Sequence, residues 1–413
     1  MGAARLCALL SAVSLLGASY YLYLPLPDSV AEPHKLMVLD AVFRTAQHVG
    51  TLTERLGLCD QVTFLQTIIS CVARVLAHSD AAVFVRDAEL GGVRVRAFTS
   101  TRGGGGPKRA VVYLHGGGWA LSGAQERGYD SQCREMASSL DAVVISVDYR
   151  LVPQHRFPVP LEDCLRAARH FLRHDTLAAF SVDPTRVAIS GDSAGGNLAV
   201  AVALQLAREP EEGSASLKLQ ALIYPVLQAL DFQTPSYQES AYVPILYGRT
   251  MVRFWLQYLG GDVALTDALL DNAHSRHVLL DPSGPGAFVD WRSLLLPPPL
   301  QPGPVPGPPV GPARPDILAQ IPALLDPRAS PLLADDDWLR TLPLTYVLTC
   351  EHDVLRDDGA MLVARLGALG VPVHRAHLDD AFHGVIQFMQ QPLAFAVGRR
   401  ALDGYLAWLD ANL

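Results

Sequence analysis

The sequence predicts an α/β fold in which helices cover both faces of a mainly parallel central sheet. Short runs rich in β-branched and aromatic residues alternate along the chain with amphipathic segments of helix length, the pattern typical of parallel sheets. Half of the 413 residues are hydrophobic and only 18% are charged, so the chain can bury a large core. Both observations indicate a large globular domain.

The alternation starts near residue 81, stops near 232 and resumes near 330. Each β-rich run is followed by a segment with helical apolar spacing, which favours connections that cross over the sheet. The expected strands are VRVRAFTS (93–100), AVVYLHG (110–116), AVVISVDYR (142–150), RVAISGD (186–192), LQALIYP (219–225), LTYVLTCEHD (344–353) and VPVHRAHLDD (371–380). The expected helices lie near 126–140, 161–173, 195–208, 358–369 and the C-terminus.

The interruption from about 232 to 330 predicts an insertion into the main domain, 81–413. Within it, 296–315 is proline-rich and of low complexity, so we expect a solvated loop there. Open α/β sheets place ligands at the carboxyl ends of their strands. The insertion is therefore predicted to form a helical cap over that edge, together with helices expected within 28–80.

The N-terminal residues 6–27 contain no charged side chain and have the length of a membrane span. A cleaved signal peptide is the alternative, but the run is long and ends in tyrosines instead of small residues. Arg5 precedes the run, whereas Asp28 and Glu32 follow it. This charge order predicts a signal anchor with residues 1–5 in the cytosol. In a eukaryotic cell the rest would lie in the lumen of the endoplasmic reticulum.

Composition argues against several classes of partner. The chain has 33 basic and 41 acidic residues, a formal charge of −8, and its basic residues are dispersed, so we expect no binding of nucleic acid. The six cysteines match no metal-binding spacing and are too few for a disulfide framework. We expect neither a metal nor a cofactor. Composition does not predict the oligomeric state.

A candidate nucleophile lies where an expected strand meets a helix. Gly191, Asp192, Ser193, Ala194 and Gly195 form a G-x-S-x-G motif in that context. The flanking glycines permit a sharp turn that would lift the Ser193 hydroxyl clear of the sheet. The Ala194 amide would then lie at a helix N-terminus, which favours negative charge. A glycine-rich turn or a phosphate loop is the alternative, although the lysine of a nucleotide-binding P-loop is missing.

The run from His115 to Gly118, HGGG, follows an earlier expected strand. In sites of this kind such a run supplies part of an oxyanion hole. We expect the amides of Gly116 and Gly117, together with that of Ala194, to receive the charge that develops on the substrate carbonyl oxygen.

A serine nucleophile needs a base, and the order Ser, acid, His places both partners downstream. His383 in LDDAFHGV follows the last expected strand, and Asp353 follows the strand before it. We expect His383 to take the proton from Ser193 and Asp353 to orient its ring. Other acids remain open as alternatives. Asp357 and Asp358 are better explained as the start of the following helix. Asp379 and Asp380 compete with Asp353.

With HGGGW, GDSAGG and the Asp353 and His383 segments in this order, the chain resembles the hormone-sensitive lipase family of α/β hydrolases. The segment DYRLVPQHRFPVPLEDC (148–164) resembles the corresponding family segment. The start YYLYLPLPDSVAEP, with MVRFW, SPLLADDD and CEHDVLRDDG, is similar to the membrane-anchored arylacetamide deacetylase branch. The resemblance implies an α/β-hydrolase fold and a type II membrane protein of the endoplasmic reticulum that hydrolyses acyl esters and aryl amides, including lipid esters.

Two other functions stay open at this level. One is a lipase acting on neutral cholesterol esters or acylglycerols, and the other is a binding protein without catalysis on the same fold. The sequence departs from the family pattern at Ala381, where the usual DGFHG becomes DAFHG. It also departs at Ala120, where arylacetamide deacetylase has a cysteine that could pair with the equivalent of Cys350. These departures leave the aim of His383 and a disulfide at Cys350 undecided.

Overall fold

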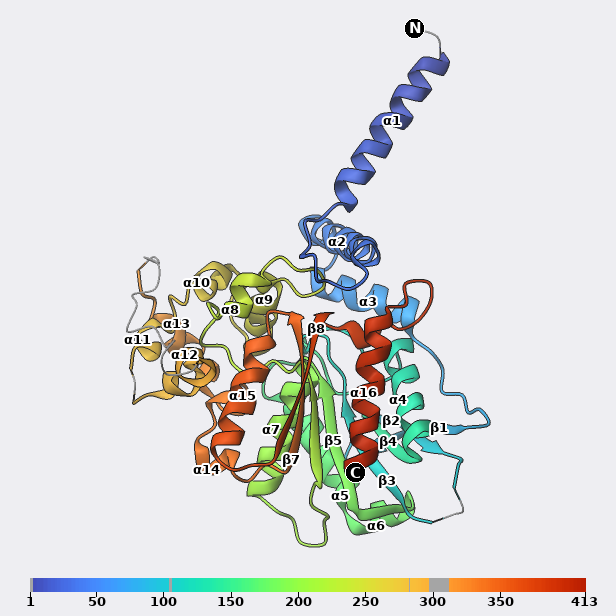
Figure 1. Cartoon of the computed structure of the whole chain (residues 1–413), viewed down its shortest axis with the longest axis vertical. Helices are drawn as coiled ribbons and strands as arrows, with labels where there is room; N and C mark the ends of the chain where they lie inside the picture. Colours follow the sequence, from blue (N-terminus) through green and yellow to red (C-terminus); the bar gives the residue numbers. More distant parts are fainter. Residues whose placement is uncertain (1–2, 104–105, 282, 297–311) are drawn as a thin grey trace.

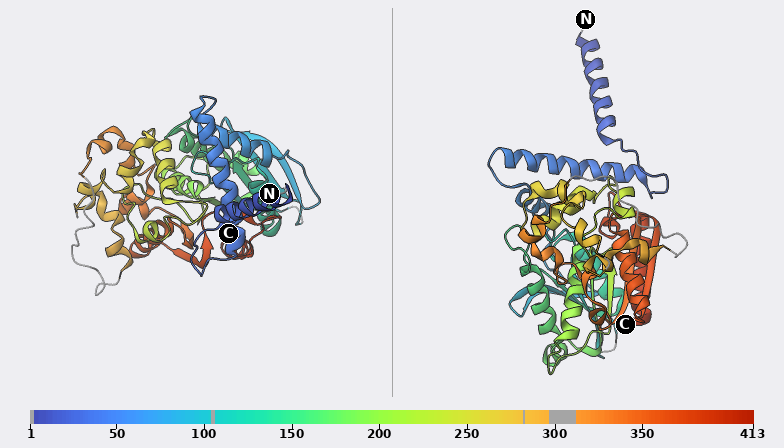
Figure 2. Two further views of the ribbon diagram at one scale, coloured as in Figure 1. Left: turned by 90° about the horizontal axis from the view of Figure 1, so that it is seen from above. Right: turned by 90° about the vertical axis from the view of Figure 1, so that its left-hand side faces the viewer.

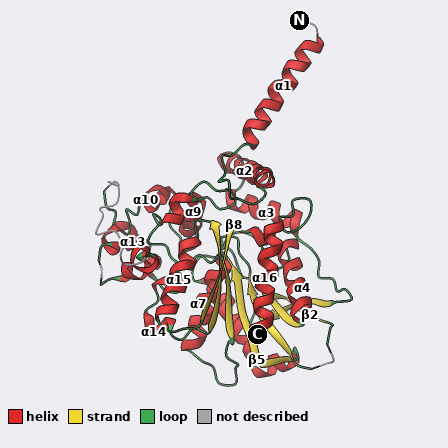
Figure 3. Ribbon diagram, viewed as in Figure 1, coloured by secondary structure: helices red, strands yellow, loops and turns green. Residues whose placement is uncertain are grey.

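A central sheet organises the computed structural model, which describes residues 3–103, 106–281, 283–296 and 312–413. Within these residues the sheet has eight strands in the order β1-β2-β4-β3-β5-β6-β7-β8 (Figures 1 and 3). The strands are β1 Val83–Leu90, β2 Val93–Ser100, β3 Lys108–Leu114, β4 Ala142–Val147, β5 Val182–Asp192, β6 Leu219–Ile223, β7 Leu344–His352 and β8 Val373–Phe382.

In the spatial order of the sheet, each pair of adjacent strands from β4 through β3, β5, β6 and β7 to β8 is parallel. The pairs β1–β2 and β2–β4 are antiparallel. The prediction of a mainly parallel sheet is confirmed. β1 was not among the expected strands, because its exposed and buried residues do not alternate regularly. It joins β2 through Gly91 and Gly92, whose φ angles of 58° and 78° suit glycine in a tight hairpin.

Helices cover both faces of the sheet, and each face has its own core. On β3, Val112 and Leu114 face the core that contains the apolar residues of α5, α7 and α15. Val111 and Tyr113 face the opposite core, which contains those of α4 and α16. This alternation follows from the two-residue period of a strand. The helices are α4 Arg127–Leu140, α5 Val159–Leu172, α6 His174–Ala179, α7 Ala194–Arg208, α14 Asp336–Leu339, α15 Arg356–Ala368 and α16 Ala396–Asn412.

The interruption between β6 and β7 folds into short helices that lie beside the sheet (Figure 1). Trp255 and Met251 of α9 pack into the same core as α5 and α7. Of the proline-rich loop expected at 296–315, residues 297–311 lie outside the described part of the chain. The helices are α8 Pro235–Glu239, α9 Gly248–Leu259, α10 Thr266–Leu270, α11 Arg276–Leu279, α12 Trp291–Leu295 and α13 Asp316–Gln320.

Three helices precede the sheet: α1 Ala3–Leu22, α2 Pro33–Arg55 and α3 Gln61–Ala73. α1 projects away from the rest of the molecule, and α2 lies across the end from which α1 projects (Figure 2). Among the described residues, no helix combines the length and the apolar character required to cross a membrane. The predicted anchor at 6–27 is therefore not confirmed.

Candidate active site

Ser193 occupies the turn between β5 and α7. Its φ of 56° and ψ of −120° are strained for a residue with a side chain, as in a nucleophile elbow. A Cβ at Gly191 would lie 2.4 Å from the carbonyl carbon of Gly195, and one at Gly195 would lie 2.0 Å from the oxygen of Leu114. Only glycine fits at these two positions, so the motif is required by the packing of the turn.

His383 and Asp353 follow the neighbouring strands β8 and β7 and meet Ser193, which follows β5, at the carboxyl edge of the sheet. His383 Nε2 lies 3.0 Å from Ser193 Oγ, and His383 Nδ1 lies 2.8 Å from Asp353 Oδ2. The amide of Leu355 donates to the other Asp353 oxygen. All three side chains are buried. The structure thus brings the three residues expected from the sequence into one hydrogen-bonded chain.

The four other candidate acids are not hydrogen-bonded to His383 and have other surroundings. Asp357 and Asp358 lie in the first turn of α15, where they accept hydrogen bonds from the amides of Ser236 and Leu227. Asp379 is almost fully exposed. Asp380 forms an ion pair with Arg400. None of the four is hydrogen-bonded to His383 among the described residues.

The prediction for Gly116 is wrong. Its amide donates to Asp192 Oδ1 over 3.0 Å and also lies 2.9 Å from Tyr129 Oη, so it has no proton left for a substrate. A Cβ at Gly116 would meet Asp192 Oδ2 at 2.5 Å. This glycine is needed for the approach of Asp192 and not for space occupied by substrate.

Asp192 joins the glycine loop to the core below it. Besides the Gly116 amide, it accepts hydrogen bonds from the hydroxyls of Tyr113 and Tyr129, at 2.9 and 3.0 Å. Burial raises the pKa of Asp192 to about 6, although these bonds oppose the shift. The two tyrosines were missed in the sequence, because a tyrosine in a strand or an amphipathic helix looks like an ordinary core residue.

The remaining amides of the site are free. Within the described residues, the N–H groups of Gly117, Gly118 and Ala194 donate to no protein acceptor. Gly117 and Gly118 have φ angles of 103° and 62°, and a Cβ at Gly118 would overlap the ring of Phe254 on α9. These amides are available for a substrate oxygen.

Two side chains hold the loop that carries the amides of Gly117 and Gly118. The His115 ring stacks on Tyr149 with a centroid separation of 4.2 Å. Gln66 of α3 donates from Nε2 to the carbonyls of Ala120 and Val152, both at 2.7 Å. The role of Gln66 has no sequence signal, since its contacts lie far away along the chain.

Comparison with known proteins identifies the family. A family model described as "alpha/beta hydrolase fold" matches residues 111–282 and 317–387. The chain belongs to the α/β-hydrolase family. The match spans the glycine loop, Ser193, Asp353 and His383, and it confirms the resemblance drawn from the sequence.

Close relatives of this hydrolase are ester hydrolases. It is 47% identical to neutral cholesterol ester hydrolase 1 of Rattus norvegicus, over 98% of this chain and 99% of the relative. It is 43% identical to arylacetamide deacetylase of Bos taurus, over 95% of this chain and 96% of the relative. This hydrolase is therefore a member of a family of carboxylic ester hydrolases.

Solved structures agree with this placement. The thermostable carboxylesterase EstE1 from a metagenomic library is 28% identical, with a TM-score of 0.61 over 86% of this chain and 95% of the other. An esterase of Pyrobaculum calidifontis is 26% identical, with a TM-score of 0.61 over 88% of this chain and 97% of the other.

The two departures of this hydrolase from its family pattern leave the site geometry intact. Ala381 is fully buried at the end of β8, and His383, two residues later, still reaches both Ser193 and Asp353. Cys350 is a free, buried thiol. Burial raises its pKa well above the usual value, so this thiol stays protonated.

Proposed function

We propose that the chain is a serine hydrolase that cleaves carboxylic esters and aryl amides through an acyl-enzyme on Ser193. The observation that carries the proposal is the continuous hydrogen-bonded chain from Ser193 through His383 to Asp353. A serine is a weak nucleophile unless a base takes its proton, and this arrangement provides one.

Acylation follows from the order of these groups. Ser193 Oγ attacks the carbonyl carbon as its proton passes to His383 Nε2, and Asp353 stabilises the imidazolium that results. The carbonyl oxygen becomes an oxyanion that accepts hydrogen bonds from the free amides of Gly117, Gly118 and Ala194. His383 then gives the proton to the leaving alcohol or amine, and the acyl group stays on Ser193 as an ester.

Deacylation repeats the sequence with water. His383 takes a proton from the water as its oxygen attacks the acyl carbon. The second oxyanion collapses, the acid leaves and Ser193 regains its proton. Neither half of the reaction requires a cofactor.

The substrate range rests on the relatives. Both an arylacetamide deacetylase and a neutral cholesterol ester hydrolase match over nearly the whole chain. We therefore propose acyl esters and aryl amides as substrates and lipid esters as a second group. Comparing the rates on a short aryl ester, an aryl acetamide and a cholesteryl ester in one preparation would separate the two.

The proposal includes a membrane anchor at residues 6–27, with the hydrolase domain in the lumen of the endoplasmic reticulum. The uncharged run and the charge order around it support this topology. The direction of α1, which leads away from the hydrolase domain, is consistent with it (Figure 1).

Labelling with a fluorophosphonate tests the catalytic proposal. The membrane-expressed wild type should label and hydrolyse p-nitrophenyl acetate and butyrate, and Ser193→Ala should lose the label and about 10⁴-fold or more of the activity. Folded wild type that does neither would favour the binding protein without catalysis.

A further inference from the structure

The outer side of α2 carries a row of exposed apolar side chains. Its members follow one another at intervals of four, seven, three and four residues, that is, after one or two helical turns, so they lie along one side of the helix. Each is at least two-fifths exposed: Val38 42%, Val42 61%, Val49 42%, Leu52 55% and Leu56 63%. We call these five residues the α2 stripe.

The opposite side of α2 already supplies the contacts that hold the helix on the protein. Leu36 and Leu39 are buried in the core shared with α4 and α16. A helix that covers a water-soluble domain normally turns polar residues outward. The α2 stripe therefore calls for a second apolar surface, since large exposed patches of this kind mark interaction sites.

The end of α1 is attached to the middle of the stripe side. Tyr21 Oη lies 3.1 Å from Thr45 Oγ1, between Val42 and Val49 along the helix. Arg44 donates to the Tyr21 carbonyl and lies over its ring. α1 thus leaves the protein from the same side of α2 as the stripe (Figure 2).

The helix pair α2–α3 is fastened to the hydrolase domain on the N-terminal side. Ser29 Oγ lies 3.0 Å from His352 Nε2, and the amide of Ala31 donates to the Asp380 carbonyl. His352 ends β7, and Asp380 lies in β8. The start of α2 is thus tied to the same two strands that carry the acid and the base.

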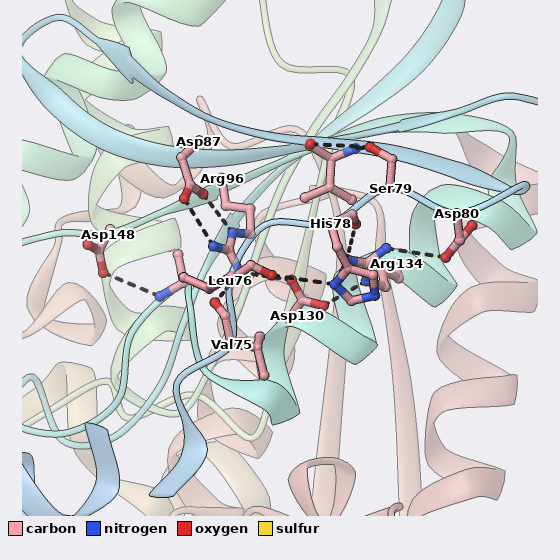
Figure 4. Close-up of polar contacts among 12 residues, drawn as sticks. Val75, Leu76, His78, Ser79, Asp80, Asp87, Arg96, Asp130, Arg134 and Asp148 are labelled. Carbon is pink, nitrogen blue, oxygen red and sulfur yellow. Dashed lines mark hydrogen bonds and ion pairs between the residues drawn. The ribbon is translucent and has the colours of Figure 1, made fainter. Parts of the chain in front are cut away.

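A second attachment follows α3. The Val75 amide donates to the Gln125 carbonyl, and the buried Arg96 donates to the Val75 carbonyl and to Asp130 (Figure 4). Because both ends are fixed, the stripe points outward as part of the folded structure.

We propose that the α2 stripe rests in the headgroup and acyl boundary of a phospholipid bilayer, as an interfacial platform beside the anchor. This proposal builds on the anchor in the proposed function. The five side chains of the stripe are all apolar, and the exposed Glu54 and Arg55 at the end of the helix carry opposite charges, so the contact with the bilayer rests on apolar burial. A bilayer is favoured over a second copy because α1 leads from the same surface.

The platform places the active site near lipid. Gln66 of α3 is hydrogen-bonded to the loop that follows the glycine run, so the helix pair that carries the stripe is also attached to the loop beside the free amides. A lipid ester in the bilayer would then lie beside the helices that support the active-site loop.

The test uses the full chain reconstituted in phosphatidylcholine vesicles with a minor fraction of phosphatidylserine. In a background with Cys7, Cys59 and Cys71 replaced by serine, an environment-sensitive fluorophore is attached at Val42→Cys or Leu52→Cys. The exposed Glu212, replaced as Glu212→Cys, is the matched control. Spin-labelled lipids should quench both stripe probes several-fold more strongly than the control, and soluble iodide should do the reverse.

A second variant, Val42→Glu with Leu52→Glu, should lower hydrolysis of a long-chain ester in vesicles by about tenfold or more, because two apolar side chains no longer enter the boundary. Its hydrolysis of soluble p-nitrophenyl acetate should stay within about twofold, which also shows that it folds.

The outcomes separate the platform from the proposals on which it rests. If the protein floats with vesicles but both stripe probes behave like the control, the platform is wrong and the anchor stands. If the stripe probes are shielded from iodide but are not quenched by spin-labelled lipid, a second copy of the protein covers the stripe. That result would also overturn the platform. A protein that does not float would overturn anchor and platform together. Ester hydrolysis, measured in parallel, reports on Ser193 separately.

Discussion

Asp353 is held so that one oxygen serves His383 and the other accepts the Leu355 amide. Asp353→Asn would keep the size of the side chain but favour the wrong tautomer of His383. We expect kcat to fall by about 10³- to 10⁴-fold with the fold intact. Asp380→Asn should retain activity within about threefold. Similar losses of kcat in the two variants would show that Asp353 is not the residue that orients His383.

Asp192 gives a pH dependence whose sign follows from its burial. Burial raises its pKa from 3.8 to about 6. A raised carboxyl pKa contributes stability that is fully present below about pH 4 and is lost as the pH rises through 6, by up to about 3 kcal/mol. Relative to Asp192→Asn, the wild type should therefore lose free energy of unfolding between pH 4 and 6.

Urea unfolding of both proteins in detergent at several pH values measures this difference. Asp379→Asn, which removes an exposed carboxylate, is the control and should follow the wild type. Parallel pH profiles for the wild type and Asp192→Asn would contradict the interpretation.

At the scale of elements, α3 stabilises a loop to which it is not adjacent in sequence. Gln66→Ala would leave the carbonyls of Ala120 and Val152 without their donor, at a cost of about 1–3 kcal/mol. We expect kcat for p-nitrophenyl butyrate to fall by about threefold to tenfold, because the free amides depend on this loop. The neighbouring Thr67→Ala is the control. An unchanged kcat in Gln66→Ala would show that the contact of α3 with this loop does not affect catalysis.

At the scale of the whole molecule, the proposed topology can be tested with one residue. The chain contains no N-x-[ST] sequon, and Glu212→Asn creates one, Asn-Gly-Ser, on the exposed segment after α7. If this domain lies in the lumen, the variant should gain a single glycan that endoglycosidase removes, whereas Glu212→Gln should not. Expression of an unglycosylated, active Glu212→Asn protein would place the domain on the cytosolic side.

The sequence by itself determined the alternation of strands and helices and the identity of Ser193 and His383, and it named Asp353 with Asp379 and Asp380 as competitors that only the hydrogen bond to His383 excludes. These features are local: a strand followed by G-x-S-x-G, or a polar residue directly after a buried strand, can be recognised over a few residues. The fold class and the ester hydrolase family followed from the same signals. The antiparallel β1 had no such signal, because its residues do not alternate.

Only the tertiary structure decided which glycine amides are free. Gly116 and Gly117 look equivalent in the sequence, yet Asp192 comes from another strand to occupy the first and leaves the second available. The supporting contact of Gln66 and the outward direction of the α2 stripe were likewise beyond the sequence. Each depends on segments that are far apart in the chain and come into contact only when the helices pack on the sheet. Neither local periodicity nor a short motif can predict such a contact.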